Sequence, residues 1–287
     1  TKFSALVLGP LALLLLFAAV SQRSVVTGKV AAAVMVLLCV ASVAAIWAVH
    51  GFQYLPSRSP SWLLHLQDTA LAQRTVPGIA YVTGWIDDYH LLPNAFTHGF
   101  LMFAQSMQPP NVTFLFGSFS EEGWWYYFPV AFLIKTPIAL IVLMSVGLFI
   151  CVRRWRGLGL TEIFIVLPVG VYLGAAMMSQ HQVGLRHILP IYPFVLLVAA
   201  MASKELIDRP VGRVALAALT MFWLATVVSV YPNTLTFFNR LVGGPRNGYK
   251  YLTASNLDWG QGLKSLKRWM DRQGVTDINL AYFGTAD

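Results

Sequence analysis

The stretch SEEGWWYYFPVAFLIKTP, residues 120–137, decides how the rest of the chain is interpreted. It begins with two carboxylates, Glu121 and Glu122, continues with four aromatic residues, and ends in an apolar run that contains Lys135. At a membrane surface acids stay in water, Trp and Tyr rings lie at headgroup level, and an apolar run enters the hydrocarbon. Lys135 would lie roughly 9 Å past the entry point at 1.5 Å per residue, where a charge is costly unless it has a partner. We therefore predict that a water-filled cavity meets the bilayer here and that Lys135 is functional.

The composition is that of a polytopic membrane protein. The chain has 287 residues, of which 57% are hydrophobic and 11% charged, whereas a soluble domain is about 25% charged. Cys39 and Cys151 both lie in apolar runs, which indicates neither a disulfide framework nor a metal site. The net charge of +8 arises from basic residues that flank the apolar segments, so it indicates membrane topology and not a nucleic-acid partner.

Six segments are apolar enough to be bilayer spans, which need about 20 residues each. They are residues 3–21, 30–50, 129–152, 161–179, 188–202 and 214–231. Basic residues fill the short loops after the first, third and fifth of these segments. The positive-inside rule places those loops in the cytoplasm, so the long, more acidic segment 51–128 is expected on the extracytoplasmic side.

The outer segment 51–128 carries local patterns of its own. Residues 60–73 and 91–107 have the apolar spacing of helices, which we expect at the membrane interface. The second of these helices is alternatively a re-entrant element or a further span, and the basic loop 153–156 argues against a further span. Residues 111–119 alternate partly and predict a short strand or an extended linker.

The chain becomes more polar after residue 231, and we expect a small, truncated α/β domain over residues 232–287. Residues 255–272 predict an amphipathic helix and residues 278–283 a buried strand. Six spans place this domain outside the cell, although its leading part is basic; charge is a weak guide for longer translocated segments. The predicted architecture is thus an all-α transmembrane domain, residues 1–231, followed by the start of an extracytoplasmic α/β domain.

Three motifs extend this interpretation: GWWYYFPVAFLIKTP at 123–137, VGLRHILPIYPF at 183–194 and FNRLVGGPRNGYKYLTASNLDWGQGLKSLKRW at 238–269. In this order they resemble the GT-C superfamily of membrane glycosyltransferases. Within it the chain is most similar to the phospholipid-carrier-dependent enzymes, relatives of protein mannosyltransferases and of the lipid A aminoarabinose transferase. The resemblance covers roughly the latter four-fifths of the chain.

The resemblance implies a multi-pass enzyme of the bacterial inner membrane. Such enzymes move a sugar from a polyprenyl-phosphate carrier to an acceptor on the extracytoplasmic face, usually with inversion of the anomeric centre. In these enzymes a carboxylate in the first external loop acts as the general base or positions the acceptor, and no residue of this chain matches it. Thr1 runs directly into an apolar segment, so we expect that an N-terminal portion carrying this carboxylate precedes the present chain.

Three basic residues are the candidates for binding the donor phosphate. Lys135 would stabilise the phosphate as it leaves, since a fixed cation is most effective where negative charge develops; the alternative is a snorkelling anchor. Arg186 is the sole Lys or Arg of its outer loop and has the fork that matches phosphate oxygens; the alternative is a contact with lipid headgroups. We expect His187 beside them, so that Lys135 and Arg186 form a phosphate clamp.

A second set of residues would contact the sugar, the acceptor or a metal ion. Adjacent carboxylates suit a hard divalent cation, although the sequence does not determine a cofactor, and such a pair is more often part of a solvated loop. The aromatic side chains would stack on the sugar or form the ordinary interfacial belt. The set comprises Asp87, Asp88, Glu121, Glu122, Trp124, Trp125 and His181.

Two other functions fit the same sequence. A transporter of lipid-linked sugars would use the same cations, but it needs ionisable residues near the middle of the spans, and the sequence has none there. A non-catalytic membrane scaffold would turn Lys135 and Arg186 towards lipid. The sequence determines neither the donor sugar nor the acceptor.

Overall fold

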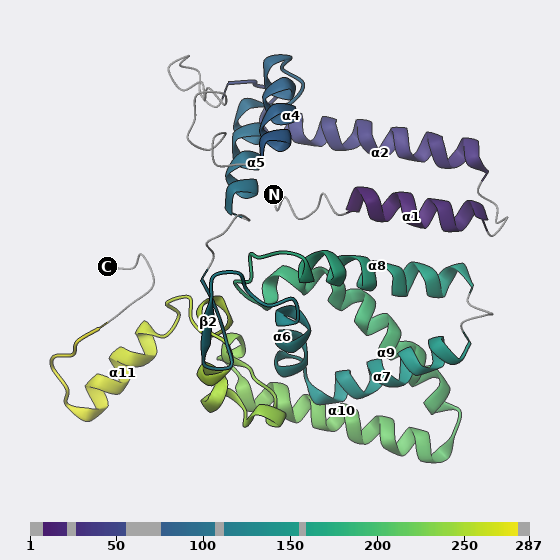
Figure 1. Cartoon of the computed structure of the whole chain (residues 1–287). Coiled ribbons are helices and arrows are strands. Elements are labelled where there is room, and N and C mark those ends of the chain that lie inside the picture. The colour runs from purple at the N-terminus through teal and green to yellow at the C-terminus, as the bar shows by residue number, and fades with distance from the viewer. Residues whose placement is uncertain (1–7, 22–26, 56–75, 107–111, 155–158, 281–287) are drawn as a thin grey trace. The chain divides into compact units, whose positions relative to one another are not determined.

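The computed structural model describes residues 8–21, 27–55, 76–106, 112–154 and 159–280. The chain forms two compact units. One unit comprises Thr1–Asn111 with Gly159–Leu167, and the other comprises Val112–Leu158 with Pro168–Asp287. Within the described ranges the structure is mainly helical and has a single two-stranded sheet (Figure 1).

Four helical segments are long and apolar enough to cross a membrane. They are α2 (Gly28–Val49), α8 (Leu160–Met177), the 3₁₀ turn η4 with α9 (Leu185–Ile207), and α10 (Pro210–Val230). In an apolar stretch of 18 residues, α2 has no residue buried within the protein and α10 has only 6% buried. Apolar helices so little covered by protein indicate a membrane-embedded protein.

The six predicted spans are confirmed in part. Beyond the four long helices, the segment 3–21 contributes α1 (Leu8–Ser21), a shorter apolar helix, and residues 1–7 lie outside the described part. The segment predicted as one span over 129–152 is instead broken into α6 (Tyr127–Lys135) and α7 (Ile138–Arg153), which are bent by 119°.

The break between α6 and α7 follows from Thr136 and Pro137. Thr136 has extended backbone angles, φ −102° and ψ 138°, which the residue before a proline prefers for steric reasons. Pro137 has no N–H to donate to the carbonyl of Leu133. The sequence analysis counted hydrophobic residues across this point and gave too little weight to the proline.

Asn239 supplies the hydrogen bonds that the broken helix lacks. Its side-chain Nδ2 donates to the carbonyl of Leu133 at 2.6 Å and to that of Thr136 at 3.0 Å, and its backbone N–H donates to Ile134 at 2.9 Å. The carbonyls at a helix C-terminus have no partner within the helix. A buried asparagine from a distant segment therefore caps α6 and fixes the bend.

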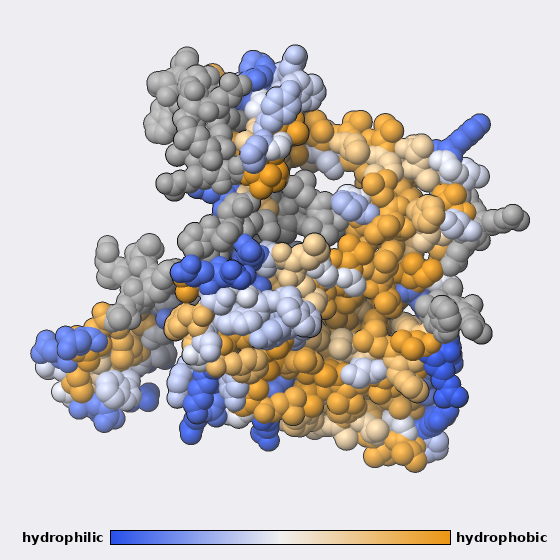
Figure 2. Space-filling model, viewed as in Figure 1, coloured by the Kyte–Doolittle hydropathy of each residue, from blue (hydrophilic) through white to orange (hydrophobic). Residues whose placement is uncertain are grey.

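Close packing joins the long helices of the second unit. A Cβ on Gly147 in α7 would lie well inside contact distance of the Val198 carbonyl in α9. Close approach of this kind depends on a small residue at the helix interface. Over α10 the surface is apolar along much of its length and hydrophilic at the turn that joins α9 to α10 (Figure 2).

The first unit contains two helices that follow α2. They are α4 (Pro77–Asp88) and α5 (Asn94–Ser106), which pack on one another. Helix α5 confirms the helix predicted over 91–107. The helix predicted over 60–73 lies outside the described residues.

A tight hairpin opens the second unit. Strands β1 (Thr113–Leu115) and β2 (Ser118–Ser120) pair antiparallel and are joined by Phe116 and Gly117. Both connecting residues have positive φ, 50° and 83°, as a two-residue hairpin turn requires. The strand predicted near 111–119 is therefore confirmed for 113–115, and it has a partner that the sequence analysis did not assign.

The C-terminal segment does not form the α/β domain predicted for it in the part that is described. Short 3₁₀ turns lead to one amphipathic helix, α11 (Leu263–Gln273), which begins eight residues later than predicted because η8 (Ala254–Asn256) and a bend precede it. Residues 278–280 of the predicted strand are not in a strand, and residues 281–283 lie outside the described range.

Candidate functional site

Lys135 lies buried at the last residue of α6, with 8% of its surface exposed. Its Nζ donates to the backbone carbonyl of Leu235 at 2.9 Å and to that of Asn256, and it lies 4.6 Å from the centre of the Phe238 ring. A cation is also favoured at this end of a helix. Protein groups thus hold the ammonium group. The snorkelling and scaffold alternatives predicted instead that it would be turned towards lipid.

Asn256 links Lys135 to the segment that carries Arg186. Its carbonyl accepts from Lys135, and its side-chain Oδ1 accepts from the backbone N–H of Leu185 at 3.0 Å. Its Nδ2 donates to the hydroxyl of Tyr127 at 3.1 Å and to the carbonyl of Thr253 at 3.2 Å. This buried amide therefore joins both ends of α6 to η4 (Leu185–Ile191).

The turn before Arg186 is fitted closely against the Asn256 segment. Ser255 Oγ donates to the Val183 carbonyl. Gly184 has φ 146°, and a Cβ there would collide with Ser255 Oγ. Glycine is required here both by its conformation and by the close approach.

Arg186 lies at the half-exposed edge of the same cluster. Its guanidinium carbon is 4.6 Å from the centre of the Trp259 ring, a cation–π distance. Trp259 is 49% exposed, and its Nε1 donates to the Ser255 carbonyl at 3.3 Å. Lys135 and Arg186 thus contact the same segment: Lys135 hydrogen-bonds to the Asn256 carbonyl, and Arg186 lies against the Trp259 ring.

The two histidines lie against one another beside this cluster. The rings of His181 and His187 have centroids 5.2 Å apart and are nearly perpendicular, and His187 also contacts Phe128. Over the ranges that the structure describes, no group of three His, Cys, Asp or Glu side chains is placed to hold a metal ion.

The acids and aromatics of 120–127 are exposed to different degrees. Glu121 and Glu122 are exposed, and so is Trp125, at 69%. Trp124 is half-buried, and its backbone N–H and carbonyl both bond the side chain of Gln182, at 2.9 Å and 2.7 Å. The exposed members face outward at the end of the hairpin, where they are available to a ligand.

Asp87 and Asp88 lie in the other unit and differ from one another. Asp88 is exposed, whereas Asp87 is buried. The carboxylate of Asp87 accepts from Asn94 Nδ2 at 3.1 and 3.2 Å and from Thr97 Oγ1 at 2.8 Å. Both carboxylate oxygens of Asp87 thus have internal donors, which supports a structural role in joining α4 to α5.

Tyr54 also contacts Asp87, and this contact affects the pKa of the Tyr54 hydroxyl. Its hydroxyl donates to the Asp87 backbone carbonyl at 3.1 Å. Burial and, secondarily, the negative charge of Asp87 raise the pKa of Tyr54 to about 12. The phenol is therefore protonated under physiological conditions and acts as a donor.

Three amides hold the site together, Gln182, Asn239 and Asn256, and the sequence singled out neither Gln182 nor Asn239 as a contact residue. Neutral amides in loops carry no charge or periodicity signal, and each bonds an element 58 to 129 residues away. Comparison of the chain with protein-family models, with curated proteins and with solved structures finds no match.

Proposed function

We propose that this chain forms the carrier-binding part of a membrane glycosyltransferase that uses a polyprenyl-phosphate-linked sugar. The observation that carries the proposal is the buried ammonium of Lys135. Its two hydrogen bonds go to backbone carbonyls, and no carboxylate of the described residues lies within salt-bridge distance of it. A buried cation without an anionic partner favours an anionic ligand.

Arg186 and Lys135 have different roles in this proposal. Arg186 is accessible and offers a bidentate fork, so it contacts the phosphate oxygens directly. Lys135 lies deeper and acts through its field, which is strong where water is excluded. His187 lies beside Arg186 and completes the phosphate site.

The reaction is a displacement at the anomeric carbon. The acceptor oxygen forms the new bond to that carbon while the bond from carbon to phosphate oxygen breaks, and the acceptor proton passes to a general base. The bond electrons remain on the polyprenyl phosphate, which gains negative charge. The two cations stabilise that charge as it develops.

The remaining predicted ligands belong to the sugar side of this proposal. The exposed side chains of Glu121, Glu122 and Trp125 are available to sugar hydroxyls and ring faces. Trp124 precedes Trp125 in the sequence, and His181 lies five residues before Arg186. In the proposed topology of six spans in a bacterial inner membrane, these residues and segment 51–128 lie on the extracytoplasmic side, as does the C-terminal segment.

A transfer assay on the full-length protein in proteoliposomes tests the proposal. Undecaprenyl-phosphate-linked hexoses and pentoses serve as donors, and release of undecaprenyl phosphate is measured. We expect Arg186→Gln and Lys135→Met each to lower the rate about a hundredfold, the usual effect of removing one group that stabilises developing charge. The exposed Arg246 supplies the control, Arg246→Gln, which should stay within about twofold of wild type.

Two results would count against the proposal. One is the absence of carrier release from every donor by the wild-type protein. The other is an unchanged rate in both cluster variants while their thermal unfolding temperatures match wild type.

A further inference from the structure

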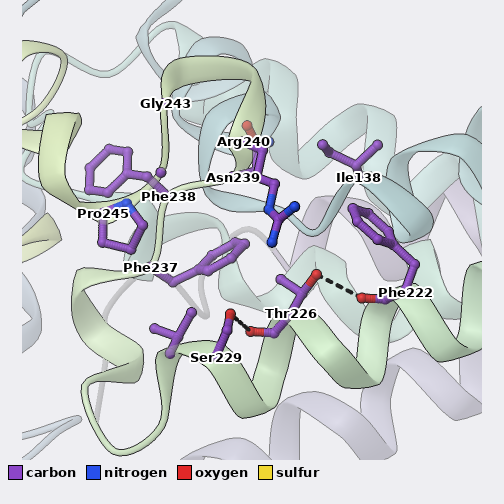
Figure 3. A pocket seen from close by; sticks show the side chains of 12 residues that line it. Ile138, Phe222, Thr226, Ser229, Phe237, Phe238, Asn239, Arg240, Gly243 and Pro245 are labelled. Atoms are coloured by element: carbon purple, nitrogen blue, oxygen red, sulfur yellow. Dashed lines mark hydrogen bonds between the residues drawn. The ribbon is translucent and has the colours of Figure 1, made fainter.

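A separate cavity lies at one end of α10. It has a volume of about 240 Å³ and is enclosed by the last turns of α10, the start of α7 and the segment 237–245. Its walls are apolar and polar in about equal parts, with Ile138, Phe222 and Phe237 on the apolar side (Figure 3). Figure 3 shows the Arg240 side chain reaching into this space towards Thr226 of α10.

Arg240 is the available cation of this cavity. The hydroxyl of Thr226 donates to the Phe222 carbonyl at 2.8 Å, and that of Ser229 donates to the Thr226 carbonyl at 2.8 Å. The Asn239 amide is committed to α6. The Arg240 side chain forms neither a hydrogen bond nor an ion pair with any residue in the described ranges. The exposed guanidinium of Arg240 therefore offers two parallel N–H donors that match phosphate oxygens.

The surroundings of the cavity match a lipid and not a soluble anion. On α10 the neighbouring side chains Leu224, Val227 and Val228 are 55%, 49% and 74% exposed, as expected of a face that contacts acyl chains. The connected segment 232–257 contains Arg240, Arg246 and Lys250 and no Asp or Glu. Basic residues next to a span attract anionic lipids.

We propose that this cavity binds an anionic membrane phospholipid. Its phosphate lies against the Arg240 guanidinium, and its acyl chain runs along the exposed face of α10. The site differs from the proposed donor site because neither Lys135 nor Arg186 lines the cavity, although Phe238 both lines it and contacts Lys135. It does not depend on the glycosyl-transfer proposal.

Lipid titration of the purified full chain in detergent tests the site. Native mass spectrometry would count bound dioleoyl-phosphatidylglycerol, with dioleoyl-phosphatidylcholine as the matched zwitterionic lipid and inorganic phosphate as competitor. We expect one phosphatidylglycerol to bind saturably, phosphatidylcholine to bind more weakly, and inorganic phosphate to displace nothing. Arg240→Gln should weaken binding about fivefold, the usual effect of one basic residue near the surface.

Two further variants distinguish the contribution of the cavity to lipid binding from that of surface charge. Ser229→Phe fills the cavity without altering any charge and should abolish the site. Arg246→Gln removes a basic residue outside the cavity and should weaken binding less than Arg240→Gln does. Arg186→Gln should leave phosphatidylglycerol binding unchanged even if it stops sugar transfer. Equal binding to wild type, Arg240→Gln and Ser229→Phe would overturn the proposal, as would displacement of the lipid by free phosphate.

Discussion

Replacing Asn239 by alanine should loosen the bend between α6 and α7. The substitution removes the Nδ2 donor from the carbonyls of Leu133 and Thr136 and leaves the backbone bond to Ile134 in place. Because Asn239 is 2% exposed, water cannot readily replace the lost donors. The helix cannot supply a donor of its own to the Leu133 carbonyl, because Pro137 has no N–H.

The magnitude follows from these two hydrogen bonds. A buried polar group left without a partner costs about 1–3 kcal/mol, so the loss of both bonds by Asn239→Ala should lower the free energy of unfolding by about 2–6 kcal/mol. At about 2–4 °C per kcal/mol for a chain of this size, the unfolding temperature should fall by roughly 4–24 °C. Few single substitutions have so large an effect without changing a large core side chain.

Tryptophan fluorescence during heating in detergent would measure the effect. Asn247 gives a matched control on the same segment, because its Nδ2 makes a single long bond of 3.3 Å to the exposed Gly243 carbonyl. Asn247→Ala should therefore shift the unfolding temperature by no more than about 2 °C. If Asn239→Ala unfolds at the same temperature as Asn247→Ala, then Asn239 does not cap α6 and the account of the bend is wrong.

Three further perturbations have defined outcomes. Gly147→Ala should destabilise the α7–α9 pair by about 1–3 kcal/mol, because its Cβ meets the Val198 carbonyl; an unchanged unfolding temperature would exclude that close approach. Asp87→Asn should cost about 1–3 kcal/mol in the same assay, because an amide donor then faces the Asn94 donor. The pKa of Tyr54 in the folded protein is about 12, so the stabilisation linked to its hydroxyl should be complete below about pH 10 and lost as the pH rises towards 12. The difference in phenolate absorbance between wild type and Tyr54→Phe, followed against pH, measures this ionisation. A midpoint near pH 10 would contradict the prediction.

The helices were predictable where local composition alone determines them. The apolar run 214–231 corresponds to α10 (Pro210–Val230), and the run 30–50 to α2 (Gly28–Val49). Each is a long apolar stretch without internal proline, so hydrophobicity and helical backbone bonding favour the same result. Nothing distant in the chain is required to form them.

The residues around Thr136 determine the break between α6 and α7 only in part. Pro137 forbids one hydrogen bond, which can produce a mild kink or a full break. The outcome of 119° depends on Asn239, more than a hundred residues further along, which satisfies the open carbonyls. A hydrophobicity count cannot contain that contact, so it could not predict that the helix over 129–152 is broken.

The functional residues show the same division between local and distant information. Lys135 stood out in the sequence because a lysine in an apolar run is costly, and the structure places it in a buried position. Its partners could not be inferred, because they are backbone carbonyls of Leu235 and Asn256, and every residue has a carbonyl. Residue type therefore identified the charge, and the fold determined how that charge is held.

In the proposed glycosyltransferase, two cations at different depths would bind one anionic ligand in different ways. Lys135 is fixed by two carbonyls at the end of α6, so its position costs little further ordering when a ligand arrives. Arg186 lies on an exposed ring and keeps the freedom to meet phosphate oxygens as they approach. Asn256 bonds both the lysine and the N–H of Leu185, so any displacement of one cation's segment is transmitted to the other. A preorganised inner charge and an adjustable outer one, joined by a single buried amide, match the requirements of a site that admits a lipid phosphate and then stabilises it as a leaving group.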